Sequence, residues 1–110
     1  MKIAALAVGV TLFSAQAFAN PAHDQIAALS EPQRAALFSK LLAKEDASCS
    51  AVNRTFYRGS DNTGNAYWAA QCRSNKAYQV QISPNATGST SLLDCAVAKS
   101  LGINCFGKFK

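Results

Sequence analysis

The sequence predicts an exported α+β domain with two disulfides. Three observations support this prediction. Apolar residues recur at helical spacing near the start of the chain, four β-type segments alternate with turns in its middle, and four cysteines all lie from residue 49 onward. A chain of 110 residues without internal repeats is long enough for one domain. We therefore expect an N-terminal helix or helical pair, an antiparallel meander of about four strands and a short C-terminal helix.

The first residues have the pattern of a secretory leader. Lys2 precedes an apolar run from Ile3 to Phe13, and Ala17 and Ala19 supply the small residues that a signal peptidase recognises. The apolar run is too short for a bilayer core, which requires roughly 20 residues. We predict a signal peptide over residues 1–19 and a single domain over residues 20–110, located in the periplasm or outside the cell and without a membrane span once the leader is removed.

Two helical segments open the predicted domain. Residues 24–29 form a short apolar-rich helix or turn. Ser30 and Gln33 then match a capping box, with Pro32 at a position where its missing amide costs nothing. The apolar stripe that follows, at i, i+1, i+4 and i+5, predicts a helix packed on a sheet, and it consists of Leu37, Phe38, Leu41 and Leu42.

Four strands are expected after residue 51. Their predicted ranges are 52–58, 66–72, 77–83 and 89–93, and the segments between them are rich in Gly, Asn, Asp, Ser and Pro. The third is the clearest, because Tyr78, Val80 and Ile82 alternate with polar residues. Asp94 is placed to cap a last helix over residues 95–101, which Gly102 ends.

An even number of cysteines in a short exported chain predicts disulfides. Neither the close spacing of a zinc site nor a nearby histidine is present. In an up-and-down meander, Cys49 and Cys72 meet at one end of neighbouring strands. Cys72 and Cys95 would be separated by an intervening strand, about 9–10 Å apart, which is beyond disulfide reach. The predicted pairs are Cys49–Cys72 and Cys95–Cys105.

Charge is distributed unevenly along the predicted domain. From residue 47 onward, seven basic residues stand against two acidic ones, whereas residues 20–46 carry a slight acidic excess. Such a basic part favours an anionic polymer or lipid as partner, and it also suits a plain solvated surface. Basic, aromatic and amide residues on the first three strands form our candidate binding face: Arg54, Tyr57, Arg58, Tyr67 and Gln79. Two alternatives to a binding face remain open: the N-terminal helix covers this face, or the face is ordinary solvated sheet.

Residues for catalysis are few. His23 is the only histidine, and its place beside the predicted new N-terminus gives no sign of what would order it. The turn at residues 61–65 lacks the later glutamate of a calcium loop, and no glycine-rich phosphate loop occurs. We therefore expect no enzyme, no cofactor and no metal site.

The function that these patterns favour is a small, basic, non-enzymatic binding module of the bacterial cell envelope. We expect its partner to be an envelope component or a protein, and we do not expect nucleic acid. The alternative is an inhibitor of a secreted hydrolase, with the loop of residues 59–65 as its contact.

Overall fold

The computed structural model describes residues 19–109. The predicted leader lies outside these residues except for Ala19, so its cleavage stays a prediction. The elements follow the order that the sequence indicated, namely α2 (Pro21–Ala28), α3 (Glu31–Lys44), β1 (Val52–Ser60), β2 (Ala66–Cys72), β3 (Ala77–Ile82), β4 (Thr90–Asp94) and α4 (Cys95–Ser100). Within the described residues, no helix is long and apolar enough to cross a membrane.

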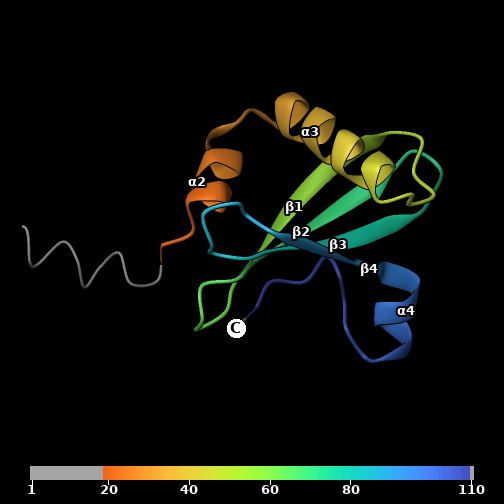
Figure 1. The fold of residues 1–110 in the computed structure, drawn as a ribbon. Coiled ribbons are helices and arrows are strands. Elements are labelled where there is room, and N and C mark those ends of the chain that lie inside the picture. The colour runs from red at the N-terminus through yellow and green to blue at the C-terminus, as the bar shows by residue number, and fades with distance from the viewer. Residues whose placement is uncertain (1–18, 110) are drawn as a thin grey trace, which may run out of the picture.

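The four strands form one antiparallel sheet in the order β1-β2-β3-β4, which confirms the predicted α+β meander (Figure 1). Irregularities in the β1–β2 pairing lie between Val52 and Arg54 and between Tyr57 and Gly59. The second of these matters for the surface, because an extra residue in one strand re-aims the side chains beside it.

Both N-terminal helices begin at side-chain caps. The predicted capping box of Ser30 and Gln33 is present at the start of α3. Helix α2 begins at Pro21, earlier than the sequence indicated, because the Asn20 side chain accepts a hydrogen bond from the amide of His23. The same Asn20 is buried, and its amide nitrogen donates to the carbonyl oxygens of Gly64 at 3.0 Å and Ile82 at 2.9 Å. Asn20 therefore fixes the start of the domain to the sheet.

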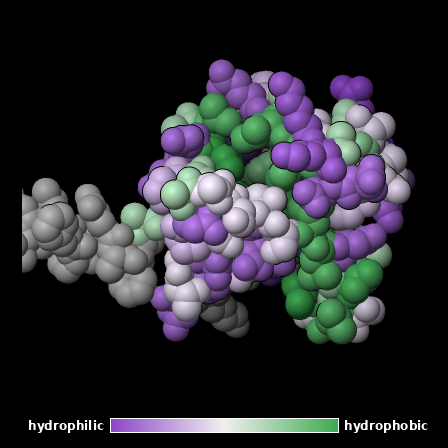
Figure 2. All heavy atoms as spheres, in the orientation of Figure 1, coloured by the Kyte–Doolittle hydropathy of each residue, from purple (hydrophilic) through white to green (hydrophobic). Residues whose placement is uncertain are grey.

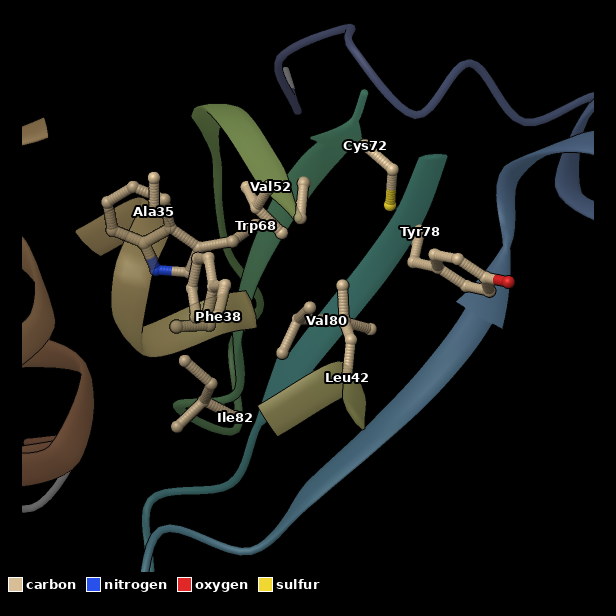
Figure 3. Close-up of a cluster of buried hydrophobic side chains, with 11 residues drawn as sticks. Ala35, Phe38, Leu42, Val52, Trp68, Cys72, Tyr78, Val80 and Ile82 are labelled. Atoms are coloured by element: carbon tan, nitrogen blue, oxygen red, sulfur yellow. The ribbon is translucent and has the colours of Figure 1, made fainter. Parts of the chain in front are cut away.

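The main core lies between α3 and one face of the sheet. Phe38 and Leu42 of α3 are almost fully buried, and Figure 3 shows them facing Trp68, Val80 and Ile82 from the strands. Burial of a side chain of this size contributes about 1.5–3 kcal/mol. Phe38, Leu41 and Leu42 of the predicted apolar stripe therefore hold α3 on the sheet. Leu37 was placed wrongly on this face, since it is 40% exposed, and Ala35 lies in the core instead.

The opposite face of the sheet carries a second, smaller core. Ala69 of β2 packs there with Ala98 of α4 and with Cys105. The ribbon places α4 and the residues that follow it, 101–109, on this side (Figure 1), and we call these residues the C-terminal segment. The Cys49–Cys72 and Cys95–Cys105 disulfides are both present, with Cα–Cα distances of 5.5 and 5.8 Å. The predicted pairing is confirmed, and the second bridge ties the C-terminal segment to α4.

Candidate functional site

The five residues of the candidate binding face do not share one face of the sheet. Arg54, Arg58, Tyr67 and Gln79 contact one another or the C-terminal segment, on the side away from α3. Tyr57 lies on the α3 side, where it is paired with Trp68 across β1 and β2 and stacked on His23. The sequence shows the alternation within each strand, but it does not show which residues of β1 and β2 lie opposite each other. Tyr57 was therefore grouped wrongly with Tyr67.

Arg58 is buried beneath the C-terminal segment, with 7% of its surface exposed. Its Nε donates to the carbonyl oxygen of Gly107 at 2.9 Å, one terminal nitrogen donates to Oε1 of Gln79, and the guanidinium lies 4.7 Å from the centre of the Phe109 ring. Burial lowers the pKa of Arg58, but an arginine remains charged in a protein. Arg58 therefore joins β1, β3 and the C-terminal segment.

An open hollow of about 600 Å³ lies between the sheet and the C-terminal segment. Three residues of the candidate face line it, namely Arg58, Tyr67 and Gln79, together with Lys108 and Phe109. A second hollow of about 570 Å³, lined by Lys99 and Phe106 among others, shares residues 102–104 with the first. The C-terminal segment thus builds much of the wall of this site, and sequence alternation gave no sign of that.

Cations lie against aromatic rings along β1 and the C-terminal segment. Arg54 lies 4.8 Å from the centre of the Phe106 ring, and Lys108 lies 5.9 Å from that of Phe56. We call the group the basic–aromatic surface, and it comprises Arg54, Phe56, Arg58, Tyr67, Phe106, Lys108 and Phe109. Arg54 and Lys108 are exposed, and no salt bridge of either is found among the described residues. These two cations are therefore free to meet an anion, whereas Arg58 is not.

The loop between β1 and β2 is organised by Asp61. Its carboxylate accepts hydrogen bonds from the amides of Thr63 and Asn65, from their side chains, and from the hydroxyl of Tyr67 at 2.8 Å. Desolvation opposes ionisation of this carboxylate, but the hydrogen bonds outweigh it and hold the pKa of Asp61 well below its usual range. The loop is held in one shape, and the Tyr67 hydroxyl is committed to it as a donor.

His23 belongs to an aromatic cluster on the α3 side of the sheet. Its Nδ1 accepts a hydrogen bond from Nε1 of Trp68 at 3.0 Å, and its ring stacks on Tyr57 with centres 4.6 Å apart. The guanidinium of Arg34 covers Trp68 at 4.9 Å. The sequence gave no sign that His23 is ordered, because its contacts come from a strand 45 residues away.

The bonded Nδ1 of His23 leaves little room for base catalysis at that atom, since a proton taken up there would break the bond from Trp68. All four cysteines are in disulfides, and none is a free thiol in the described part of the chain. No group of three His, Cys, Asp or Glu side chains that could hold a metal ion occurs among residues 19–109.

The chain matches no protein-family model, no curated protein and no solved structure.

Proposed function

We propose that this chain is a non-enzymatic binding module of the bacterial cell envelope that contacts an anionic component through its basic–aromatic surface. The observation that supports the proposal is the placement of Arg54 and Lys108, which are exposed beside the rings of Phe106 and Phe56. Phe106 lines one of the two hollows and Lys108 the other. The two disulfides and the lack of a membrane-spanning helix in the described residues are compatible with the periplasm or the cell exterior.

The chemistry of the surface favours phosphate or carboxylate groups. Exposed cations attract such groups over a Debye length of about 8 Å at physiological salt, and a basic surface concentrates anions nearby. The carboxylate of Asp61, which accepts from the hydroxyl of the hollow-lining Tyr67, is saturated by hydrogen bonds from its own loop and from Tyr67. It therefore competes weakly for these cations. Wall polymers and lipid head groups both present the required anions.

The test is binding of the secreted, oxidised protein to an envelope fraction at increasing salt. The variant Arg54→Gln/Lys108→Gln removes two charges from the surface, and Lys40→Gln/Lys44→Gln removes two exposed charges from α3 as the matched control. We expect binding to weaken with salt and in the first variant only. Binding that is unchanged by salt, or equally weakened in both variants, would overturn the proposal. Arg58 is unsuitable for this test because its side chain holds the fold together.

Inhibition of a secreted hydrolase is a second candidate function, and the loop ordered by Asp61 supports it. Asn62 and Thr63 at its tip are exposed while the loop backbone is fixed. A loop that is rigid before binding loses less entropy on docking to an enzyme. Replacing the exposed Asn62 by arginine should abolish inhibition of envelope or secreted hydrolases while leaving the melting temperature unchanged, because the hydrogen bonds to Asp61 come from Thr63, Asn65 and Tyr67. Inhibition retained by this variant would exclude the loop as the contact.

A further inference from the structure

The two outer edges of the sheet are treated differently by the rest of the chain. On the edge of β1, the amide of Val52 donates to Oγ of Ser39, and the amide of Thr55 donates to Oε2 of Glu31, both at 2.8 Å. Farther along, the carbonyl oxygen of Arg58 accepts from the amide of Phe109 at 2.9 Å. Side chains of α3 and the C-terminal segment therefore close this edge against further strand pairing, as natural proteins commonly do.

No comparable hydrogen bonds cover the edge of β4 among residues 19–109. The bond from the Ser83 amide to the Ser89 carbonyl oxygen fixes the phase of the β3–β4 ladder. Since hydrogen-bonded pairs alternate in an antiparallel ladder, Ser91 and Leu93 face β3, whereas Thr90, Leu92 and Asp94 direct their amides outward. In the described part of the chain, these three amides donate to no side chain and to no backbone group outside the regular elements. Among residues 19–109, no such hydrogen bond closes this edge at any point along the strand.

The open groups are arranged symmetrically about Leu92, and we propose that β4 pairs antiparallel with β4 of a second copy of this chain. A two-fold axis at Leu92 places Leu92 opposite Leu92 of the other copy and Thr90 opposite Asp94. All three residues direct their amides outward. The Leu92 and Asp94 amides meet the carbonyl oxygens of Leu92 and Thr90 of the other copy, and the Thr90 amide meets the carbonyl oxygen of Asp94, which it shares with the start of α4 because Asp94 is the N-cap of that helix. A two-fold interface uses the same surface patch on both copies, and the result is one continuous eight-stranded sheet.

Charge and side-chain contacts are compatible with this pairing. The strand has no basic residue, and its one acidic side chain, Asp94, is already paired with Lys76 at 2.9 Å. No like charges therefore meet across the axis, and the hydroxyl of Thr90 lies opposite the Asp94 carboxylate of the other copy. Figure 2 shows apolar residues reaching the surface between α3 and α4 on the side where β4 lies. Beyond the strand, Val97 and Leu101 are 50% and 67% exposed.

The contact is small, so we expect a weak, reversible dimer that forms at protein concentrations of about 100 µM and above. Both copies are positively charged, and salt should strengthen the dimer by screening their repulsion. Added salt should therefore strengthen the dimer, whereas it should weaken the binding of an anionic partner. Failure of the dimer therefore leaves the proposed function untouched, and failure of anion binding leaves the dimer untouched.

The experiment combines sedimentation equilibrium with amide hydrogen exchange by NMR over a concentration series. We expect a monomer–dimer equilibrium in which the Thr90, Leu92 and Asp94 amides gain protection as concentration rises, while the Val52 and Thr55 amides do not change. A monomer at all concentrations, or a dimer in which these three amides gain no protection, would overturn the proposal.

Two variants make the test specific. Thr90→Pro removes one outward amide that the ladder with β3 does not use, and proline is tolerated at the first residue of an edge strand. We expect it to remove the dimer while the melting temperature remains near that of the parent. Ser91→Lys places a charge beside the axis, and Asn53→Lys places one on the closed edge of β1 as its control; both original side chains are exposed. Only Ser91→Lys should weaken the dimer, and equal effects of the two lysines would contradict the contact.

Discussion

Trp68 donates its indole N–H to Nδ1 of His23 at 3.0 Å. The bond joins α2 to the middle of the sheet, and it requires a neutral imidazole whose other nitrogen carries the proton. Desolvation lowers the pKa of His23 below its ordinary value of 6.5, and the nearby charge of Asp24 opposes this shift. The attachment of α2 is therefore sensitive to acid.

We predict that the free energy of unfolding decreases as the pH falls below 6.5. The folded pKa of His23 is lowered, so the unfolded chain takes up this proton first, and stability present above the unfolded pKa is lost as pH falls through the folded value. Urea denaturation between pH 5 and 8 measures the effect. His23→Gln retains an acceptor that does not titrate, and its stability should be flat over this range. An equal slope in the variant would assign the effect to other groups.

Arg34 should be the most important basic residue for the position of α2. It donates to the carbonyl oxygens of Ile26 and Leu29 at the end of α2, to Oγ1 of Thr55, and it covers Trp68. Arg34→Met retains much of the packing but leaves these acceptors unpaired, and it should cost about 1–3 kcal/mol of stability in urea denaturation. Lys40→Met, at an exposed position of the same helix, should cost less than about 0.5 kcal/mol.

Removing one disulfide should destabilise a different part of the fold from removing the other. By loop entropy, the Cys49–Cys72 and Cys95–Cys105 bridges contribute about 3.4 and about 2.8 kcal/mol respectively. Cys72 also belongs to the main core, so replacing the first pair by alanine should destabilise the whole sheet. Replacing the second pair should release α4 and the C-terminal segment while the α3 core persists. Hydrogen exchange distinguishes these results, because only the first variant should lose protection in β2 and β3.

Much of the fold was predictable because it depends on local signals. The capping box at Ser30, the alternation in β3 and the positions of the cysteines each determine structure within a few residues or across neighbouring strands. The sheet order and both disulfide pairs followed from these signals.

The candidate site was less predictable because contacts distant in sequence build it. Burial of Arg58 depends on Gly107 and Phe109, about 50 residues away, in a segment without regular structure. The face occupied by Tyr57 depends on the β1–β2 register, which the irregularity between Tyr57 and Gly59 shifts. Strand alternation correctly separates the two faces of one strand, but it says nothing of what covers them.

The side chain of Asn20, the first residue of the predicted domain, should contribute strongly to stability. Its side chain is buried, and its amide nitrogen supplies the hydrogen bonds to Gly64 and Ile82. Asn20→Ala should cost about 1–3 kcal/mol in urea denaturation, because two buried carbonyl oxygens lose a donor. Asn20→Asp should cost more at pH 7, since a carboxylate oxygen then faces both carbonyl oxygens. The difference between the two variants should narrow as the pH approaches 4, where the aspartate gains a proton that it can donate. Equal stabilities at pH 7 would show that Asn20 acts only as a helix cap, because aspartate caps a helix as well as asparagine does.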